Sequence, residues 1–336
     1  MFRQNVMEDF FKRYSYVLLF GFLFSIATTS CENEVDINAD WKETIIIYGL
    51  LDANDSIQYI KINKAFLNEK QSAYQVAQIA DSLYLDSVRA SITDLNTGEV
   101  IPLIRLNKLP KDSGIFNNDV NFLWQTSRKL SEGREYEINV RNPITGIAVN
   151  ARTKTVSTAS IRAPFTSKKS IFSLGTDYIT VLCSPGLNSK AYDIKFTVEY
   201  EEINTNDTSV KVTKTAIWNM VSNFQVSSGD LIRKIEKTAF LQFLGNTIKA
   251  DPNYLHRIKS VGAIFYGGNQ DLVDYISVNE PSIGIVQKQS EYSNVKGGLG
   301  LFASRCKQEI NGIKFDPASV KNLQTSPYTK ALNFIQ

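Results

Sequence analysis

The sequence offers few residues for acid–base or nucleophilic chemistry. It contains a single histidine, His256, in the segment DPNYLHRIK. Histidine is the residue most often used for general acid–base catalysis near neutral pH. The sequence has no GxSxG elbow, no HExxH zinc motif and no P-loop. We therefore expect no acyl transfer or zinc hydrolysis by these routes, and we expect His256 to lie in a loop, in a packing or solvent contact.

Carboxylates offer a second kind of chemistry, because a pair of Asp or Glu side chains can hydrolyse glycosides. Glu199 and Glu201, in VEYEE, would share the polar face of a strand whose other face is apolar. A solvated sheet surface explains this spacing without catalysis. The alternative is a carboxylate-dependent surface hydrolase of glycans or peptides, which would need two carboxylates about 5–10 Å apart in a cleft.

Glycine and aromatic residues could contribute to a binding site. Two glycine clusters occur late in the chain, and backbone amides at glycines can hold anions. Neither cluster has the strand-then-helix context of an anion loop, so we expect turns with positive φ or close backbone packing. Aromatic side chains could stack on sugars or peptides, although core packing is the simpler expectation. The residues concerned are Gly267, Gly268, Gly297, Gly298 and Gly300, and Trp124, Trp218, Tyr266, Tyr275 and Tyr292.

One cysteine near the N-terminus has a context that predicts a covalent modification. Residues 16–31, YVLLFGFLFSIATTSC, form an apolar run that follows three basic residues and ends at Cys31. This arrangement resembles a bacterial lipoprotein signal peptide, in which the cysteine thiol is acylated and the cysteine becomes residue one of the mature chain. Thr28 stands where the usual motif prefers Leu, a departure common in Bacteroidota. The alternatives are an ordinary secretory signal and an uncleaved N-terminal anchor.

The segment after Cys31 is polar and acidic. We expect residues 1–30 to be the signal peptide and residues 31–41 to be an acidic tether between lipid and fold. The DINAD sequence in this tether matches the first half of a calcium loop, but Trp41 and Ile47 occupy its glycine and glutamate positions. We therefore expect no metal site, and no cofactor motif occurs elsewhere.

The mature chain would carry a nearly balanced charge and two remaining cysteines. Removing residues 1–30 leaves 34 Lys and Arg against 32 Asp and Glu, which gives no electrostatic reason to expect a nucleic-acid ligand. Cys183 and Cys306 could form one disulfide or remain buried thiols. Both lie in apolar, strand-like runs, ITVLC and LGLFASRC, and this favours buried thiols.

Short alternating runs with intervening turns predict a mostly β protein. We expect an immunoglobulin-like β-sandwich over residues 42–160, interrupted by a short helix within residues 72–83. The Ser/Thr-rich stretch at 157–170 marks a domain boundary. Residues 161–336 would form a larger β-rich domain with one packed helix near residues 229–244, where apolar residues recur at helical spacing.

A short motif of Asp, then Ser, then an apolar residue occurs three times between residues 55 and 88. It resembles the O-glycosylation acceptor that Bacteroidota use on exported proteins. The candidate acceptors are Ser56, Ser82 and Ser87.

Several segments together are similar to a known family. They are the end of the signal at Cys31, IIIYGLLDANDSIQYIKINKAFL, SAYQVAQIADSLY and, most specifically, NVKGGLGLF at residues 294–302. They resemble uncharacterised Bacteroidota outer-membrane lipoproteins, a family with a domain of unknown function, often encoded beside TonB-dependent receptors. The resemblance implies a mostly β lipoprotein with an immunoglobulin-like N-terminal domain, and it implies no enzymatic activity.

These observations predict a non-enzymatic accessory or ligand-binding protein. We expect it at the outer membrane, held by lipid on Cys31, on the cell surface, with a TonB-dependent receptor as a candidate partner. Its ligand could be a small molecule, a glycan or a peptide, and the sequence does not say which. The alternatives are the carboxylate-dependent hydrolase and a structural or adhesive surface protein.

The lipid anchor can be tested by one substitution. We expect Cys31→Ala to abolish incorporation of labelled fatty acid and to release the protein from the membrane fraction, because the thiol is the acylation site. Metabolic labelling and cell fractionation measure both effects. Unchanged labelling and membrane association would contradict the assignment of Cys31.

Overall fold

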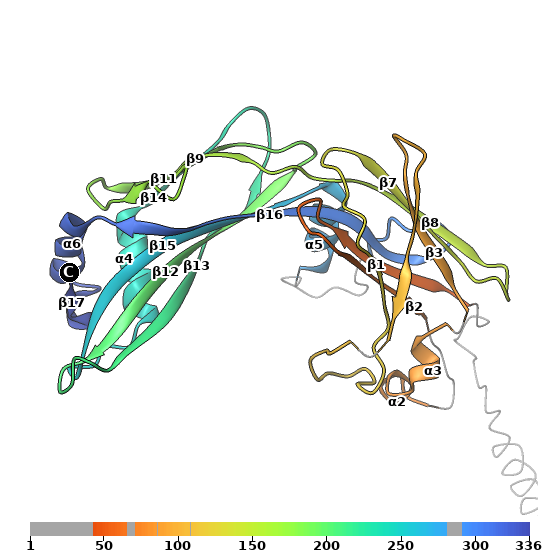
Figure 1. The fold of residues 1–336 in the computed structure, drawn as a ribbon, viewed down its shortest axis with the longest axis horizontal. Coiled ribbons are helices and arrows are strands. Elements are labelled where there is room, and N and C mark those ends of the chain that lie inside the picture. The colour runs from red at the N-terminus through yellow and green to blue at the C-terminus, as the bar shows by residue number, and fades with distance from the viewer. Residues whose placement is uncertain (1–42, 66–70, 86, 108, 281–290) are drawn as a thin grey trace, which may run out of the picture. The chain divides into compact units, whose positions relative to one another are not determined.

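The computed structural model describes residues 43–65, 71–85, 87–107, 109–280 and 291–336 (Figure 1). The predicted signal peptide and tether, with Cys31, lie outside these residues. Of the described residues, 46% lie in strands and 15% in helices, which confirms the prediction of a mostly β protein. None of the helices in these ranges has the length and apolar character needed to cross a membrane.

The elements are as follows. The strands are β1 (Ile45–Leu51), β2 (Gln58–Lys64), β3 (Arg89–Asp94), β4 (Val100–Pro102), β5 (Ile104–Leu106), β6 (Leu123–Thr126), β7 (Glu135–Arg141), β8 (Ala148–Lys154), β9 (Ser160–Ala163), β10 (Ile171–Phe172), β11 (Tyr178–Ser184), β12 (Ala191–Asn204), β13 (Lys211–Gln225), β14 (Leu231–Glu236), β15 (Tyr254–Gly268), β16 (Leu299–Phe315) and β17 (Phe334–Ile335). The helices are α2 (Ala73–Ala77), α3 (Ala80–Leu83), α4 (Lys237–Thr247), α5 (Gln270–Asn279) and α6 (Val320–Thr325), and 3-10 turns occur at Pro317–Ser319 and Lys330–Leu332.

One long sheet connects the two halves of the chain (Figure 1). Its strand order is β13-β12-β15-β16-β1-β2-β6-β5. Neighbouring strands along this path are antiparallel, except that β1 and β16 run parallel. Two smaller sheets have the orders β14-β11-β9 and β4-β3-β7-β8.

The N-terminal core lies between two facing sheets. Apolar side chains of β1 and β2 in the long sheet meet those of the four-stranded sheet, as expected for a β-sandwich. The core includes Ile45, Ile47, Ile60, Ile92, Tyr136 and Ile138, each at most 2% exposed. Alternation of buried and exposed residues along β7 and β8 gives each strand one apolar face, which explains why this core forms.

The C-terminal core is built around four phenylalanines. It lies between β12, β15 and β16 of the long sheet, the three-stranded sheet and α4. Phe172 lies with its ring centroid 4.9 Å from that of Phe196, and Phe196 lies 5.6 Å from Phe240. Phe165 packs edge-on against Phe172 at 6.2 Å. Tilted and edge-to-face contacts of this kind add to the hydrophobic contribution of burial.

The helix predicted near residues 229–244 is wrong in its first half. Leu231–Glu236 form strand β14, which pairs antiparallel with β11, and the helix α4 starts only at Lys237. The β-branched Ile232 and Ile235 suit a strand, and the available edge of β11 overrides the helical spacing of the apolar residues. Asp230, which precedes β14, accepts a hydrogen bond from Ser184 and forms an ion pair with Arg162.

The other helices refine the prediction further. The helix predicted within residues 72–83 is two short helices, α2 and α3, and Ser72 and Gln75 form a capping box at the start of α2. The described part of residues 161–336 contains α5 and α6 in addition to α4, so one packed helix is too few. The sequence DLVDYISV forms most of α5.

The late glycines allow β16 to reach the N-terminal sandwich. Gly300 has φ +114°, and a Cβ atom there would lie 2.0 Å from the carbonyl oxygen of Ile47 on β1. A Cβ atom on Gly298 would lie 2.4 Å from the carbonyl oxygen of Ile45. Asn294 holds the same segment, because its side chain accepts from the amide of Phe302 and donates to the carbonyl of Phe302. The glycines therefore serve close backbone packing, as the sequence predicted.

Two glycine substitutions test this contact. We expect Gly300→Ala to lower the free energy of unfolding by roughly 3 kcal/mol, because it combines an unfavourable φ with a clash against β1. Gly312→Ala is the matched control, since Gly312 also has positive φ but a Cβ atom there would meet no other atom within 4 Å. We expect Gly312→Ala to lower the free energy of unfolding by about 1 kcal/mol. Equal costs in denaturant unfolding would contradict the role of close approach.

Candidate functional site

The three candidate O-glycosylation acceptors differ in accessibility. Ser56 is exposed and lies in the turn between β1 and β2, next to the exposed Asp55. Ser82 is half-buried within α3, and Ser87 is half-buried beside Asp86, which lies outside the described residues. A transferase needs access to the acceptor hydroxyl, so Ser56 is the best placed of the three. Whether any is modified stays a prediction.

The histidine does not lie in a loop, which corrects the expectation from the sequence. His256 lies in β15, is 1% exposed, and packs between the rings of Tyr200 and Phe334 at 5.9 and 5.8 Å. Its Nδ1 contacts the carbonyl oxygen of Leu332. The side chain therefore joins the C-terminal segment to the sheet and is closed to substrate.

The two carboxylates singled out in the sequence are neutralised by neighbouring cations. Glu199 and Glu201 lie on one face of β12, as predicted, and both are half-buried. The ammonium nitrogen of Lys259 lies 4.0 Å from a carboxylate oxygen of Glu199 and 3.7 Å from one of Glu201. The guanidinium of Arg257 lies 3.6 Å from the other carboxylate oxygen of Glu201. Glu199 also accepts a hydrogen bond from Ser260 at 2.8 Å. These contacts form a cross-strand ladder between β12 and β15.

The aromatic residues singled out in the sequence have different positions. Trp124 is buried in the N-terminal core, and Trp218 stacks on Phe243 at the C-terminal core. Tyr275 on α5 meets Tyr48 of β1 edge-on at 6.5 Å. Tyr266 is half-buried and lines a pocket beside α5. Core packing therefore explains the tryptophans but not the tyrosines around α5.

Helix α5 is held at its start by a buried polar network. Asn269 caps the helix by accepting from the amide of Leu272 at 3.2 Å, and it donates to Thr153 of β8 at 2.7 Å. Ser304 of β16 is fully buried and donates to the carbonyl of Leu51 at 2.9 Å. The amide of Asn269 donates to the carbonyl of Ser304 at 3.1 Å. This network fixes α5 against both the sandwich and the long sheet.

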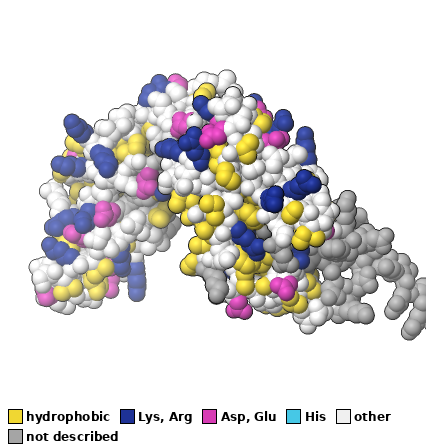
Figure 2. Space-filling model, turned by 45° about the vertical axis from the view of Figure 1, so that its right-hand side comes forward, with side chains coloured by type: hydrophobic (Ala, Val, Ile, Leu, Met, Phe, Trp, Pro, Cys, Tyr) yellow, Lys and Arg dark blue, Asp and Glu magenta, His cyan; other side chains and the backbone are white. Residues whose placement is uncertain are grey.

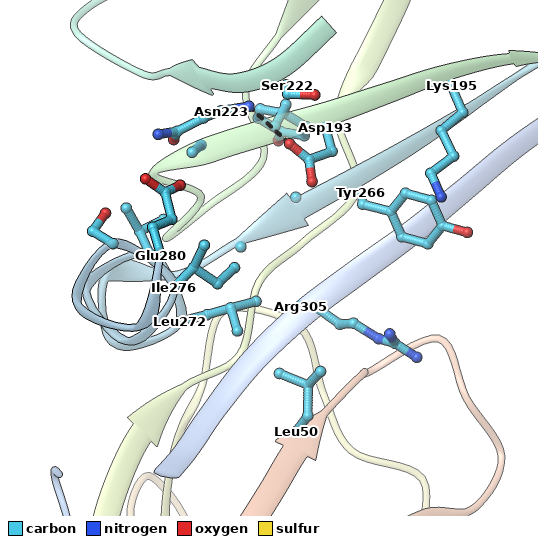
Figure 3. Close-up of a pocket in the computed structure, with 16 residues that line it drawn as sticks. Leu50, Asp193, Lys195, Ser222, Asn223, Tyr266, Leu272, Ile276, Glu280 and Arg305 are labelled. Atoms are coloured by element: carbon cyan, nitrogen blue, oxygen red, sulfur yellow. Dashed lines mark hydrogen bonds between the residues drawn. The ribbon is translucent and has the colours of Figure 1, made fainter. Parts of the chain in front are cut away.

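The pocket lies between α5 and the face of the long sheet that carries Tyr266 (Figure 3). Its volume is about 540 Å³, within the range of small-molecule sites. The glycines at the end of β15 contribute to its wall, and a Cβ atom on Gly267 would meet Tyr192 at 2.8 Å and Cys306 at 2.9 Å. No larger side chain fits there without displacing these two.

The two cations and the apolar side chains of α5 line different parts of this pocket. Figure 3 shows Lys195 and Arg305 on the side of Tyr266, and Leu272 and Ile276 on the side of α5. Leu50 of β1 adds to the apolar lining, and two carboxylates, Asp193 and Glu280, complete the charged groups. Ile276 is 47% exposed although it belongs to a helix that faces the protein. Such a lining, mostly apolar with a few fixed polar groups, is typical of ligand sites.

Sequence reasoning found parts of this site and missed others. Tyr266 and the pair Gly267 and Gly268 were singled out, but Lys195, Arg305 and α5 were not. Gly267 and Gly268 end β15 directly before α5, so the expectation that neither glycine cluster lies between a strand and a helix was wrong for this pair. A signal was present, because Asn269 followed by Asp271 fits the start of a helix directly after a strand. The charged residues had no local signal, since they come from strands far apart in the sequence.

A lysine near the short helices has the most perturbed pKa among the described amines. Burial lowers the pKa of Lys61 to about 8, and Lys111 adds a smaller repulsion. The Lys61 ammonium donates to Asn121 at 2.6 Å, to Tyr84 at 3.1 Å and to the carbonyl of Phe122 at 3.1 Å. Three oxygens satisfy its three donors, so this group holds the segment around Asn121 against β2.

The outer face of the N-terminal half carries exposed apolar side chains. Figure 2 shows hydrophobic groups gathered on the face turned toward the viewer, among scattered charges. On β1, β2 and β5 of the long sheet, Tyr48 and Tyr59 are each 47% exposed, and Ile104 is 62% exposed. Tyr59 and Ile104 both pair with Gln125, so they share one face of the sheet.

A scan of protein-family models finds no match to this chain, and a search of curated proteins finds no match either. The family resemblance of the sequence therefore stays a prediction. The geometry of the pocket is the main guide to function.

The buried cysteines give a test of the core around this site. Cys183 and Cys306 are free thiols, each at most 1% exposed, and burial raises the pKa of each to about 11. At pH 8 only about 0.1% of such a thiol is thiolate, against roughly a quarter for an ordinary cysteine. We expect iodoacetamide to leave both unlabelled in the native protein and to label both in guanidinium chloride. Rapid labelling of either in the native protein would contradict this.

Proposed function

We propose that this protein is a lipid-anchored cell-envelope protein that binds a small ligand without transforming it. The observation that carries the proposal is the pocket beside α5, which combines a volume of about 540 Å³ with fixed charges and an apolar helix face. Because Asn269 and Ser304 hold α5 through buried hydrogen bonds, the pocket is formed before a ligand arrives. A preformed pocket avoids part of the entropic cost of binding.

The residues best suited to catalysis are committed to structural contacts. His256 is closed off in β15, and Glu199 and Glu201 face Lys259 and Arg257. The described residues contain no group of three or more His, Cys, Asp or Glu side chains that could hold a metal ion. These contacts support binding over a carboxylate-dependent hydrolase.

The anchor gives such a binding protein a place to act. The apolar run ending at Cys31 and the acidic tether would hold the domain at the outer membrane, on the cell surface. Tethering raises the local concentration of the bound ligand near any partner in the same membrane. The family resemblance supports a TonB-dependent receptor as that partner.

Native mass spectrometry tests the binding function. We expect the full lipidated chain, purified from its own envelope or incubated with envelope extract, to retain a small-molecule adduct. Ser222→Trp should remove the adduct, because Ser222 is an exposed residue of β13 that lines the pocket, and an indole there would occupy part of the space that the ligand needs. Thr215→Trp is the matched control, since Thr215 is exposed on the same strand outside the pocket.

The results that support the proposal differ from those that contradict it. Retention by the wild type and by Thr215→Trp, with at least a tenfold loss in Ser222→Trp, would support the proposal. An adduct that persists in Ser222→Trp, or no adduct in the wild type, would contradict it.

A further inference from the structure

We infer that the pocket beside α5 takes a ligand with a single carboxylate next to an apolar side chain, such as the C-terminal end of a short peptide. The carboxylate would lie on the guanidinium of Arg305, and the apolar side chain would lie on Leu272 and Ile276. This inference rests on the proposed binding function and names its ligand class.

Arg305 is the group that selects a carboxylate. It lies on β16 opposite Gly268, lines the pocket, and has a buried Nε that lacks a hydrogen-bond partner among the described residues. Burial raises the pKa of the nearby Asp52 and the charge of Arg305 lowers it, but the Asp52 carboxylate already accepts from the amides of Asn54 and Lys307 at 3.0 and 3.1 Å. Among the described residues the guanidinium of Arg305 forms no ion pair within 4 Å, and its planar fork matches the geometry of a carboxylate.

A second cation strengthens the same end of the pocket. The ammonium of Lys195 lies 5.6 Å from the centre of the Tyr266 ring, and within the described ranges it forms no ion pair at 4 Å. Figure 3 shows Lys195 and Tyr266 on the same side of the pocket as Arg305. Asp193 lies two residues before Lys195 on β12 and accepts from the amide of Asn223 at 2.8 Å. The cationic end therefore favours one negative charge.

The overall charge of the lining argues against polyanions. The two cations are balanced by two carboxylates, Asp193 and Glu280, so a nucleotide or polyphosphate would meet repulsion as well as attraction. Glu280 follows α5 and lies away from Arg305 in Figure 3. A peptide end suits this separation, because its carboxylate is followed by amide N–H groups that a carboxylate can accept from.

The apolar wall accounts for the rest of the ligand. Leu272 and Ile276 lie one helical turn apart on α5 and both line the pocket, with Leu50 on the sheet side. No side chain of α5 is buried, although the helix is amphipathic and rigidly capped. An apolar ligand group would cover these side chains and gain the free energy of removing them from water.

Calorimetry with matched peptides tests the inference. The probes are N-acetyl-Leu-Leu with a free carboxylate and the same peptide as its C-terminal amide, titrated into the full lipidated chain in detergent. We expect the acid to bind about 10- to 100-fold more tightly than the amide, as for a charge-assisted bidentate contact. Arg305→Gln should reduce the acid to the affinity of the amide, and Ile276→Ser should weaken both peptides equally.

Controls separate folding from recognition. Arg233→Gln removes an exposed cation from β14, outside the pocket, and should leave the preference for the acid unchanged. Thermal unfolding of Arg305→Gln shows whether that variant is folded. Arg305→Lys is a second variant, which keeps the positive charge but loses the planar fork. We expect it to lower the preference for the acid over the amide without abolishing it.

Three results would overturn the inference. They are equal binding of acid and amide, an unchanged preference in folded Arg305→Gln, and no binding of either peptide. In each case an adduct that Ser222→Trp abolishes would show that the pocket still binds a ligand of another class, so the two proposals fail separately.

Discussion

The parallel pairing of β1 with β16 is the constraint on which the rest of the structure depends. Strand β16 pairs with β15 in its later part and with β1 in its earlier part, and so carries one sheet across two hydrophobic cores. The contact is possible because Gly298 and Gly300 lack side chains where β1 approaches. Buried Ser304 then joins β1, the segment at Val156 and the start of α5 through hydrogen bonds, since a buried hydroxyl without partners would be costly.

The pocket is a consequence of this junction. Pairing of β16 with β15 places Arg305 beside the end of β15, and pairing with β1 brings Leu50 to the same place. Several other charges on the long sheet form ion pairs, Lys259 with Glu201 between β15 and β12, and Lys307 with Glu309 along β16. The cations of the pocket differ because the carboxylates near them are held by backbone amides, as at Asp52 and Asp193.

Local patterns predicted the elements that depend on local interactions. The β class, the positive φ of Gly297 and Gly300 and a helical segment within residues 72–83 could be predicted, because period and φ are properties of short segments. Errors occurred where a distant strand decided the outcome. Leu231–Glu236 became a strand because β11 offered an open edge, and His256 was buried because the C-terminal segment folded over it.

The sequence by itself determined the class of the fold and the tight glycine contacts of NVKGGLGLF, each of which depends on residues within about one element. The processing site at Cys31 stays a prediction of the same local kind. Only the tertiary structure decided which strands share a sheet and which charged groups meet in the pocket. Lys195, Tyr266 and Arg305 come from β12, β15 and β16, and strand order in a sheet is set by the burial of whole faces. No short segment carries that information, so the pocket could be found only in the folded chain.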